Sequence, residues 1–253
     1  MPQSVGIMAS GWRATAVAAS WSPLDLTGLV GWWDASDTTT ITHSSNAVSQ
    51  FDDKSGNGFH LTQSTAGNKP TTNTRTINAL NTIDFDGTDD KLDRTGIGAR
   101  TGTVGTWAVV VAIDNISPVY YQRLALSLAD TGGTDYGGTT GVVPCAGHDA
   151  GTTKVAPFYG VGAAVPKVDV SDTNKHILIT QRNGADWSIW LDGGTAVTGT
   201  AGTGAFNITR IRMGDAWHGG AALNGIVGEQ IWAETTESIT DLRNYLNAKW
   251  AVY

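Results

Sequence analysis

The stretch Trp107-Ala-Val-Val-Val-Ala-Ile113 decides the fold class, because it is apolar at every position. The sequence of a strand with one solvent-exposed face alternates between polar and apolar residues. The sequence of a strand covered on both faces is a short continuous apolar run. The stretch is also far shorter than the ~20 apolar residues of a membrane-crossing helix. We therefore expect a strand in the middle of a sheet, with packed side chains above and below it.

Similar short runs of β-branched and aromatic residues recur along most of the chain. Gly, Asn, Asp and Ser clusters separate them, and Asn183-Gly184 is typical of a tight hairpin turn. This pattern predicts an all-β sandwich. The further expected strands are Leu29–Trp33, Val48–Phe51, Phe59–Thr62, Thr82–Phe85, Arg123–Leu128, Val155–Tyr159, Lys175–Gln181, Trp187–Leu191, Ile208–Met213 and Gly225–Trp232.

The two ends of the chain differ from its middle. Near the C-terminus, apolar residues recur at helical spacing after the capping residue Ser238, which predicts an amphipathic helix over 238–250. Packing on its own domain is favoured over packing against a partner. Residues 1–25 are rich in Ala and Ser and show no apolar periodicity, so we expect an extended arm before a sandwich domain of residues 26–253. The arm's expected partner-anchoring residues are Val5, Ile7, Met8, Trp12 and Trp21.

Charge and cysteine content narrow the function classes. The chain has 16 Lys and Arg against 23 Asp and Glu, a net charge of −7, which disfavours binding to nucleic acid or to an acidic membrane surface. Cys145 is the single cysteine, so no intrachain disulfide forms. Arg13 interrupts the apolar stretch at the N-terminus, so we expect no signal peptide and synthesis in the cytoplasm.

Several segments resemble, in order, the concanavalin A-like (laminin G-like) jelly roll. The resemblance spans about Leu26 to Trp250, and domains with this opening and ending are similar to those of tailed-phage virion proteins. It implies a head decoration, head fibre or tail component located in the virion, bound to other virion proteins through its arm; fibres of this kind are often trimeric. The matching segments are Gly28–Asp37, Val48–Gly58, Ile83–Asp90, Trp187–Gly193, Leu223–Trp232 and Tyr245–Trp250.

Lectins, glycosidases, lyases and structural modules all have this fold, so the function has to be inferred from particular residues. Glycosidases use two carboxylates beside the scissile bond, and the family's hydrolases supply them from one strand as Glu-x-Asp-x-Glu. The nearest run here, Glu229–Glu234, places its two carboxylates on opposite faces of a strand. Zinc-type His spacing and a Gly-x-Ser-x-Gly elbow are also missing. We therefore expect a structural protein that is not an enzyme, with no catalytic residue.

Calcium is the strongest metal hypothesis. Asp52, Asp53 and Asn57 offer hard oxygen ligands in a glycine-bent loop. A structural turn explains the same residues and is favoured over a calcium site. Asp86, Asp89 and Asp90 form a second cluster with the same two interpretations.

A host-surface glycan is the alternative partner, which would make the chain a lectin, with or without Ca²⁺. Sugar binding needs exposed aromatic rings beside polar groups, and Tyr136, Trp217 and His218 lie in Gly-rich loops that could expose them. Most other tryptophans are expected in the core. The long Gly/Thr stretch 130–153 is the first place to expect a binding surface, a solvated crossover being the alternative.

Overall fold

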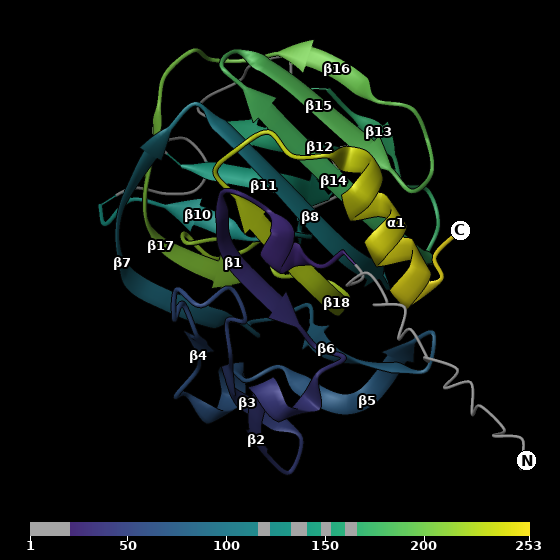
Figure 1. The fold of residues 1–253 in the computed structure, drawn as a ribbon. Helices are drawn as coiled ribbons and strands as arrows, with labels where there is room; N and C mark the ends of the chain where they lie inside the picture. Colours follow the sequence, from purple (N-terminus) through teal and green to yellow (C-terminus); the bar gives the residue numbers. More distant parts are fainter. Residues whose placement is uncertain (1–20, 116–121, 133–140, 148–152, 160–165) are drawn as a thin grey trace, which may run out of the picture.

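The computed structural model describes residues 21–115, 122–132, 141–147, 153–159 and 166–253. This part of the chain forms 18 strands and one α-helix, with short 3-10 turns at Pro23–Asp25, Thr38–Thr40 and Ala66–Asn68 (Figure 1). The elements are β1 (Leu29–Asp34), β2 (Ile41–Ser44), β3 (Ala47–Phe51), β4 (Leu61–Thr62), β5 (Thr71–Ile77), β6 (Leu80–Asp86), β7 (Leu92–Gly102), β8 (Val104–Ile113), β9 (Gln122–Arg123), β10 (Ser127–Ala129), β11 (Val142–Gly147), β12 (Lys154–Tyr159), β13 (Val168–Asp169), β14 (Lys175–Asn183), β15 (Asp186–Leu191), β16 (Val197–Thr200), β17 (Phe206–Met213), β18 (Asn224–Ala233) and α1 (Ile239–Trp250).

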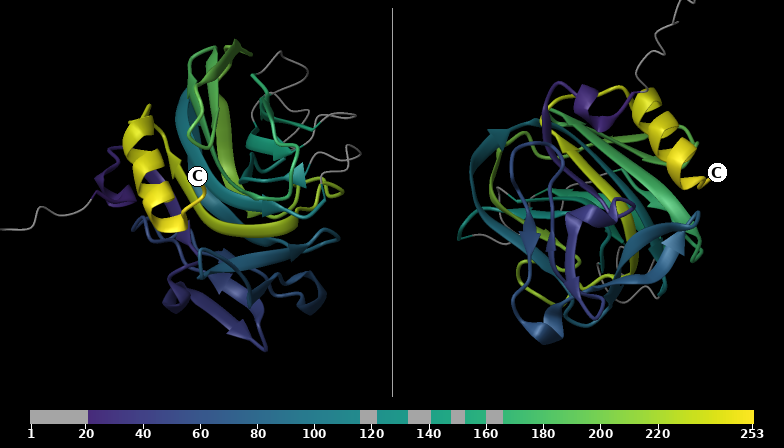
Figure 2. Two further views of the ribbon diagram at one scale, coloured as in Figure 1. Left: turned by 90° about the vertical axis from the view of Figure 1, so that its right-hand side faces the viewer. Right: turned by 60° about the horizontal axis from the view of Figure 1, so that its bottom comes forward.

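The strands form two antiparallel layers. In the first layer β16, β15, β14, β8 and β18 follow one another, and β18 also pairs with β1 and β6. In the second layer β12, β11, β10, β17, β7, β4, β3 and β2 follow one another. Helix α1 lies on the outer face of the first layer (Figure 2, left). The expected all-β sandwich with a C-terminal helix is confirmed.

Strand β8 is covered on both faces, as its sequence predicts. Val109 and Val111 belong to the cluster between the two layers, whereas Val110 belongs to a second cluster beneath α1. Most of the large aromatic rings are buried in the same way. Trp33, Trp107, Trp187 and Trp232 fill the core between the layers.

Helix α1 packs on its own domain. The Ser238 hydroxyl accepts a hydrogen bond from the Asp241 N–H at 3.3 Å and caps the first turn. Leu242, Leu246 and Trp250 are fully buried against the first layer. Each buried side chain of this size contributes roughly 1.5–3 kcal/mol by leaving water, so the helix is an integral part of the domain.

The sequence pattern misses six of the described strands: β2, β5, β7, β11, β13 and β16. β7 is the longest of them, and Gly96 and Gly98 within it have positive φ. Pairing with β17 supplies its backbone hydrogen bonds, and a register shift at Ile208/Arg210 absorbs the irregularity. One further expectation is wrong: Arg123–Leu128 is not one strand, since β9 and β10 divide it. The stretch 130–153, expected to hold a binding surface, contains β11 in its described part, and its residues 133–140 and 148–152 lie outside the described residues.

Candidate functional site

A row of polar side chains crosses the outer face of the second layer. Neighbouring members lie directly opposite each other in five successive antiparallel ladders, so they point to the same side of the layer. At about 4.8 Å per strand the row is about 24 Å long. We call it the polar row; its members are Thr42, Gln50, Thr62, Asp93, Arg212 and Ser127.

Core packing fixes which way the polar row points. Each member is next in sequence to a residue buried between the layers, and side chains alternate along a strand. The polar row therefore points away from the core and from α1, and at its Trp217 end Ser127 is fully buried. The buried neighbours are Ile41, Phe51, Leu61, Leu92, Ile211 and Leu128.

A groove of about 520 Å³ lies over one end of the polar row. Every side chain that lines it is polar, and hydroxyl and amide groups both donate and accept hydrogen bonds. We call it the row groove; its lining residues are Thr42, Ser49, Gln50, Thr62, Gln63, Ser64, Lys69 and Asp93.

Trp217 lies at the other end of the polar row. Its indole N–H donates to the Ser127 carbonyl at 3.0 Å, and the guanidinium carbons of Arg210 and Arg212 each lie 4.2 Å from its ring centroid. Arg212 also donates two hydrogen bonds to the Asp93 carboxylate, at 2.7 and 2.8 Å. The Trp217 ring, which was predicted to contact sugar, is thus fixed beside polar groups, and the guanidinium groups of Arg210 and Arg212 lie against it.

The other two predicted sugar-contacting residues are less informative. His218 is exposed next to Trp217 in the β17–β18 loop. Tyr136 lies outside the described residues. The structure therefore brings Trp217 and His218 to one place.

The first calcium candidate is held by internal hydrogen bonds. The Asp53 oxygens accept from three backbone N–H groups at 2.8–3.0 Å, those of Trp32, Ser55 and Phe59. The Asn57 amide donates to the Val30 carbonyl at 2.9 Å, and the Asp52 carboxylate accepts from Gln50 at 2.7 Å. These contacts account for the loop without a cation, so the geometry favours the structural turn.

The second acidic cluster adjoins a smaller pocket. Ligand oxygens of Asp86, Asp89 and Asp90 all lie within 4.8 Å of one another, the one such group in the described part of the chain. Burial, together with the charge of Asp86, raises the pKa of Asp90 to about 6. The adjoining pocket measures about 270 Å³ and is lined by Gly87, Thr88, Asn115, Gln122, Gly220, Ala222 and Asn224.

Hydrogen bonds within the loop also explain the shape of this cluster. The Asp90 carboxylate accepts from the Asp86 N–H at 3.0 Å, and the Asp86 carboxylate accepts from the Thr88 N–H at 2.8 Å. Turns of this kind are common where Asp precedes Gly. The cluster therefore does not identify a metal site by itself.

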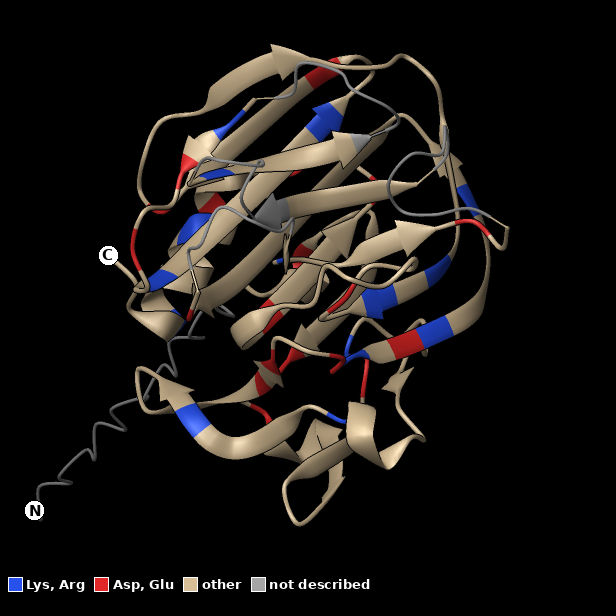
Figure 3. Cartoon of the chain, turned by 180° about the vertical axis from the view of Figure 1, so that it is seen from behind, with Lys and Arg blue, Asp and Glu red and all other residues tan. Residues whose placement is uncertain are grey.

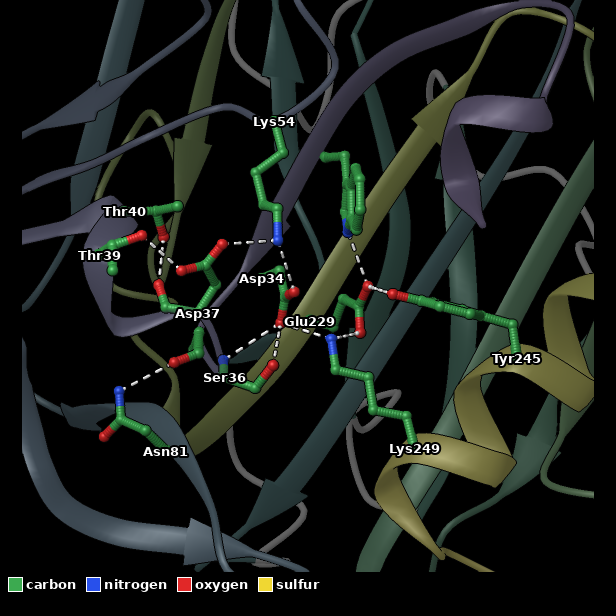
Figure 4. A network of polar contacts seen from close by, with 12 residues as sticks. Asp34, Ser36, Asp37, Thr39, Thr40, Lys54, Asn81, Glu229, Tyr245 and Lys249 are labelled. Atoms are coloured by element: carbon green, nitrogen blue, oxygen red, sulfur yellow. Dashed lines mark hydrogen bonds and ion pairs between the residues drawn. The ribbon is translucent and has the colours of Figure 1, made fainter. Parts of the chain in front are cut away.

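A third polar group, which the sequence did not reveal, lies between α1 and the first layer (Figure 4). Glu229 of β18 is 1% exposed, yet its carboxylate accepts four hydrogen bonds at 2.7–2.8 Å. The donors are the indole N–H groups of Trp32 and Trp250, the Tyr245 hydroxyl and the Lys249 ammonium.

A second carboxylate completes this network. Asp34 lies opposite Glu229 in the β1–β18 ladder, and the Lys249 ammonium lies 2.6 Å from the Asp34 carboxylate and 2.8 Å from that of Glu229. Burial alone would raise the pKa of Asp34, but Lys249 and Lys54 outweigh it and hold that pKa below its usual value. Burial and the charge of Asp34 raise the pKa of Glu229.

This network is a structural clamp rather than a reaction centre. Two carboxylates do converge, but all four Glu229 contacts are made within the protein and its side chain is closed to substrate. Buried charges persist when ions of opposite sign and hydrogen bonds compensate them. Because the pair comes from two strands far apart in sequence, a search for a single-strand motif does not find it.

Of the predicted arm-anchoring residues, Trp21 lies within the described part of the chain. Its ring meets the Tyr245 ring of α1 edge-to-face, with centroids 5.6 Å apart. It therefore contacts its own domain. Val5, Ile7, Met8 and Trp12 lie outside the described residues.

No established protein-family description matches the chain, and no curated protein matches it either. Solved structures do share its fold. An arabinofuranosidase complexed with arabinofuranosyl-alpha-1,2-xylobiose superposes with a TM-score of 0.60 at 16% identity, over 78% of this chain and 49% of that one. A Trypanosoma rangeli sialidase in complex with 2,3-difluorosialic acid superposes with a TM-score of 0.57 at 15% identity, over 88% of this chain and 33% of that one.

These neighbours correct one expectation. The chain spans about half the length of the arabinofuranosidase and a third of that of the sialidase, and at this identity the similarity establishes the fold. Since the fold forms part of glycoside hydrolase chains, the prediction that this protein is not an enzyme is contradicted. The missing Glu-x-Asp-x-Glu strand was an insufficient reason, as the convergence of Asp34 and Glu229 from separate strands illustrates.

Within the described residues, no helix combines the length and the apolar character needed to cross a bilayer.

Proposed function

We propose that the chain is a glycan-binding, concanavalin A-like jelly-roll domain carried on the surface of a phage virion. One observation carries the binding part of this proposal: the row groove lies on the outer face of the second layer and is lined by polar side chains alone. A ligand rich in hydroxyl groups can replace the water that such side chains hold.

Hydrogen bonds within the protein hold several groove side chains in place. The Ser49 hydroxyl donates to the Thr42 carbonyl at 3.1 Å, and the Gln63 amide donates to the Lys91 carbonyl at 3.1 Å. A hydroxyl that donates once still has lone pairs that accept from a sugar. Side chains fixed before binding lose less conformational freedom when the ligand arrives, which favours affinity.

Trp217 supports an extended ligand. It lies past Arg212 at the end of the polar row opposite the row groove. Aromatic rings beside hydrogen-bonding groups suit the mixed apolar and polar surface of a sugar. An oligosaccharide along the polar row would meet polar groups first and this ring last.

Glycan binding is tested on an array of bacterial surface saccharides, with calorimetry on the best ligand. We expect Thr62→Val with Gln50→Ala to lose binding, because these substitutions remove hydrogen-bonding groups from the floor of the row groove. Thr88→Val, in the smaller pocket, is the matched control and should bind like the wild type. A wild type that binds no saccharide refutes the proposal, and loss only in Thr88→Val refutes the site.

Two additional measurements use the same samples. Repeating the binding measurement with a chelator present shows whether binding depends on a divalent cation. Reducing-end release shows whether a bound saccharide is also cleaved, as glycoside hydrolases do.

The virion part of the proposal rests on the resemblance to tailed-phage virion proteins and is tested separately. Deleting residues 1–20 leaves Trp21 and its contact with Tyr245 in place. We expect the shortened protein to fold and bind glycan but to fail to enter particles. Normal incorporation would refute the anchoring role of this segment.

A further inference from the structure

The row groove contains one charged side chain that is paired within the described part of the protein and one that is not. Its lining contains one carboxylate, Asp93, and one ammonium, Lys69. Asp93 is neutralised by Arg212 through hydrogen bonds of 2.7 and 2.8 Å. Lys69 makes no hydrogen bond or ion pair through its ammonium to any described residue.

We infer that the row groove selects a saccharide bearing a negatively charged group, which the Lys69 ammonium binds while neighbouring hydroxyl and amide groups hold the sugar ring. This inference rests on the proposed glycan-binding function and adds the ligand's charge to it. Lys69 is partly buried and lines the row groove, so a carboxylate or sulfate on a bound sugar would lie within reach of its ammonium and form a charge-assisted hydrogen bond with it.

The charges elsewhere on the protein do not attract an anionic sugar, so a preference for one depends on direct contact with Lys69. The Asp52 carboxylate, close to the groove residue Gln50 in sequence, accepts a hydrogen bond from the Gln50 amide at 2.7 Å. Seen from behind, both basic and acidic residues occur along the described strands (Figure 3). With a net charge of −7 the whole molecule repels polyanions, so the preference must come from contact with Lys69 rather than from long-range steering.

The test compares an oligouronide with the same oligosaccharide after carboxyl reduction, by calorimetry on the full chain. We expect the wild type to bind the charged form about three- to tenfold more tightly, the range for one partly buried charged contact. Lys69→Ala should remove the preference, Lys69→Arg should keep it, and raising the salt concentration should reduce it. Lys175→Ala, at the start of β14, is the control and should bind like the wild type.

A sulfated form of the neutral oligosaccharide distinguishes the two charged groups. Preference for either charged form supports the inference and names the group. Equal binding of charged and neutral forms, or a preference that survives Lys69→Ala, overturns the charge assignment and leaves glycan binding intact. Absence of any saccharide binding overturns the proposed function and the inference together.

Discussion

Replacing Lys249 by Met tests whether the buried network holds α1 to the first layer. The Lys249 ammonium lies 2.6 Å from Asp34 and 2.8 Å from Glu229, which are 4% and 1% exposed. Breaking a buried ion pair by removing one partner costs about 3–5 kcal/mol. For a domain of this size that loss corresponds to a decrease in melting temperature of roughly 10 °C.

The assay is urea unfolding followed by tryptophan fluorescence, with melting temperature as a second readout. Lys249→Met should lose more stability at neutral than at acid pH, because burial already raises the pKa of Glu229 and removing the cation raises it further. A raised carboxyl pKa destabilises the fold as pH rises through it. Glu229→Gln combined with Lys249→Met should recover part of the loss.

A surface substitution, Lys175→Met, is the control and should change stability little. The clamp interpretation is refuted if Lys249→Met loses less than about 1 kcal/mol, the scale of an exposed ion pair. It is also refuted if the double variant is no more stable than the single one.

Three further substitutions test the buried polar groups. The pKa of Asp90 is raised to about 6, so the charge of this carboxylate destabilises the fold above that pH. Asp90→Asn should increase the free energy of unfolding by up to about 3 kcal/mol at pH 7.5 and change it little at pH 4, measured by urea unfolding. Burial lowers the pKa of His176, but hydrogen bonds to Asp192 and Asp172 outweigh it and raise that pKa. The stability from these contacts is present at acid pH and is lost as pH rises through the raised pKa. His176→Asn should therefore be more destabilising at pH 5.5 than at pH 9, measured by thermal melts. Asp53→Ala strands three backbone N–H groups and should cost about 3 kcal/mol, with or without a chelator; a loss seen only without chelator would indicate a bound cation instead.

The parts of the fold that the sequence predicts are those with strong local patterns. The apolar run of β8 and the helical spacing of Leu242, Leu246 and Trp250 both depend on neighbours along the chain, and both are confirmed. β7 escaped prediction because its polar, Gly-rich sequence becomes a strand only through pairing with β17. Local propensity gives way there to tertiary hydrogen bonding.

The candidate site shows the same division. Trp217 was predicted as an aromatic residue in a Gly-rich loop, because its surroundings in sequence carry that signal. The polar row was not predicted, since its six members come from six strands and meet only through sheet register. The convergence of Asp34 and Glu229 depends on register in the same way.

Glycan binding at the row groove is tested most directly by titrating the best-binding oligosaccharide into isotopically labelled protein and following backbone amide shifts. The account predicts that the largest changes fall on Gln50, Thr62, Lys69 and Asp93, with smaller ones near Trp217. Changes confined to the loop 86–90 and residues 220–224, or no changes at saturating saccharide, would contradict it.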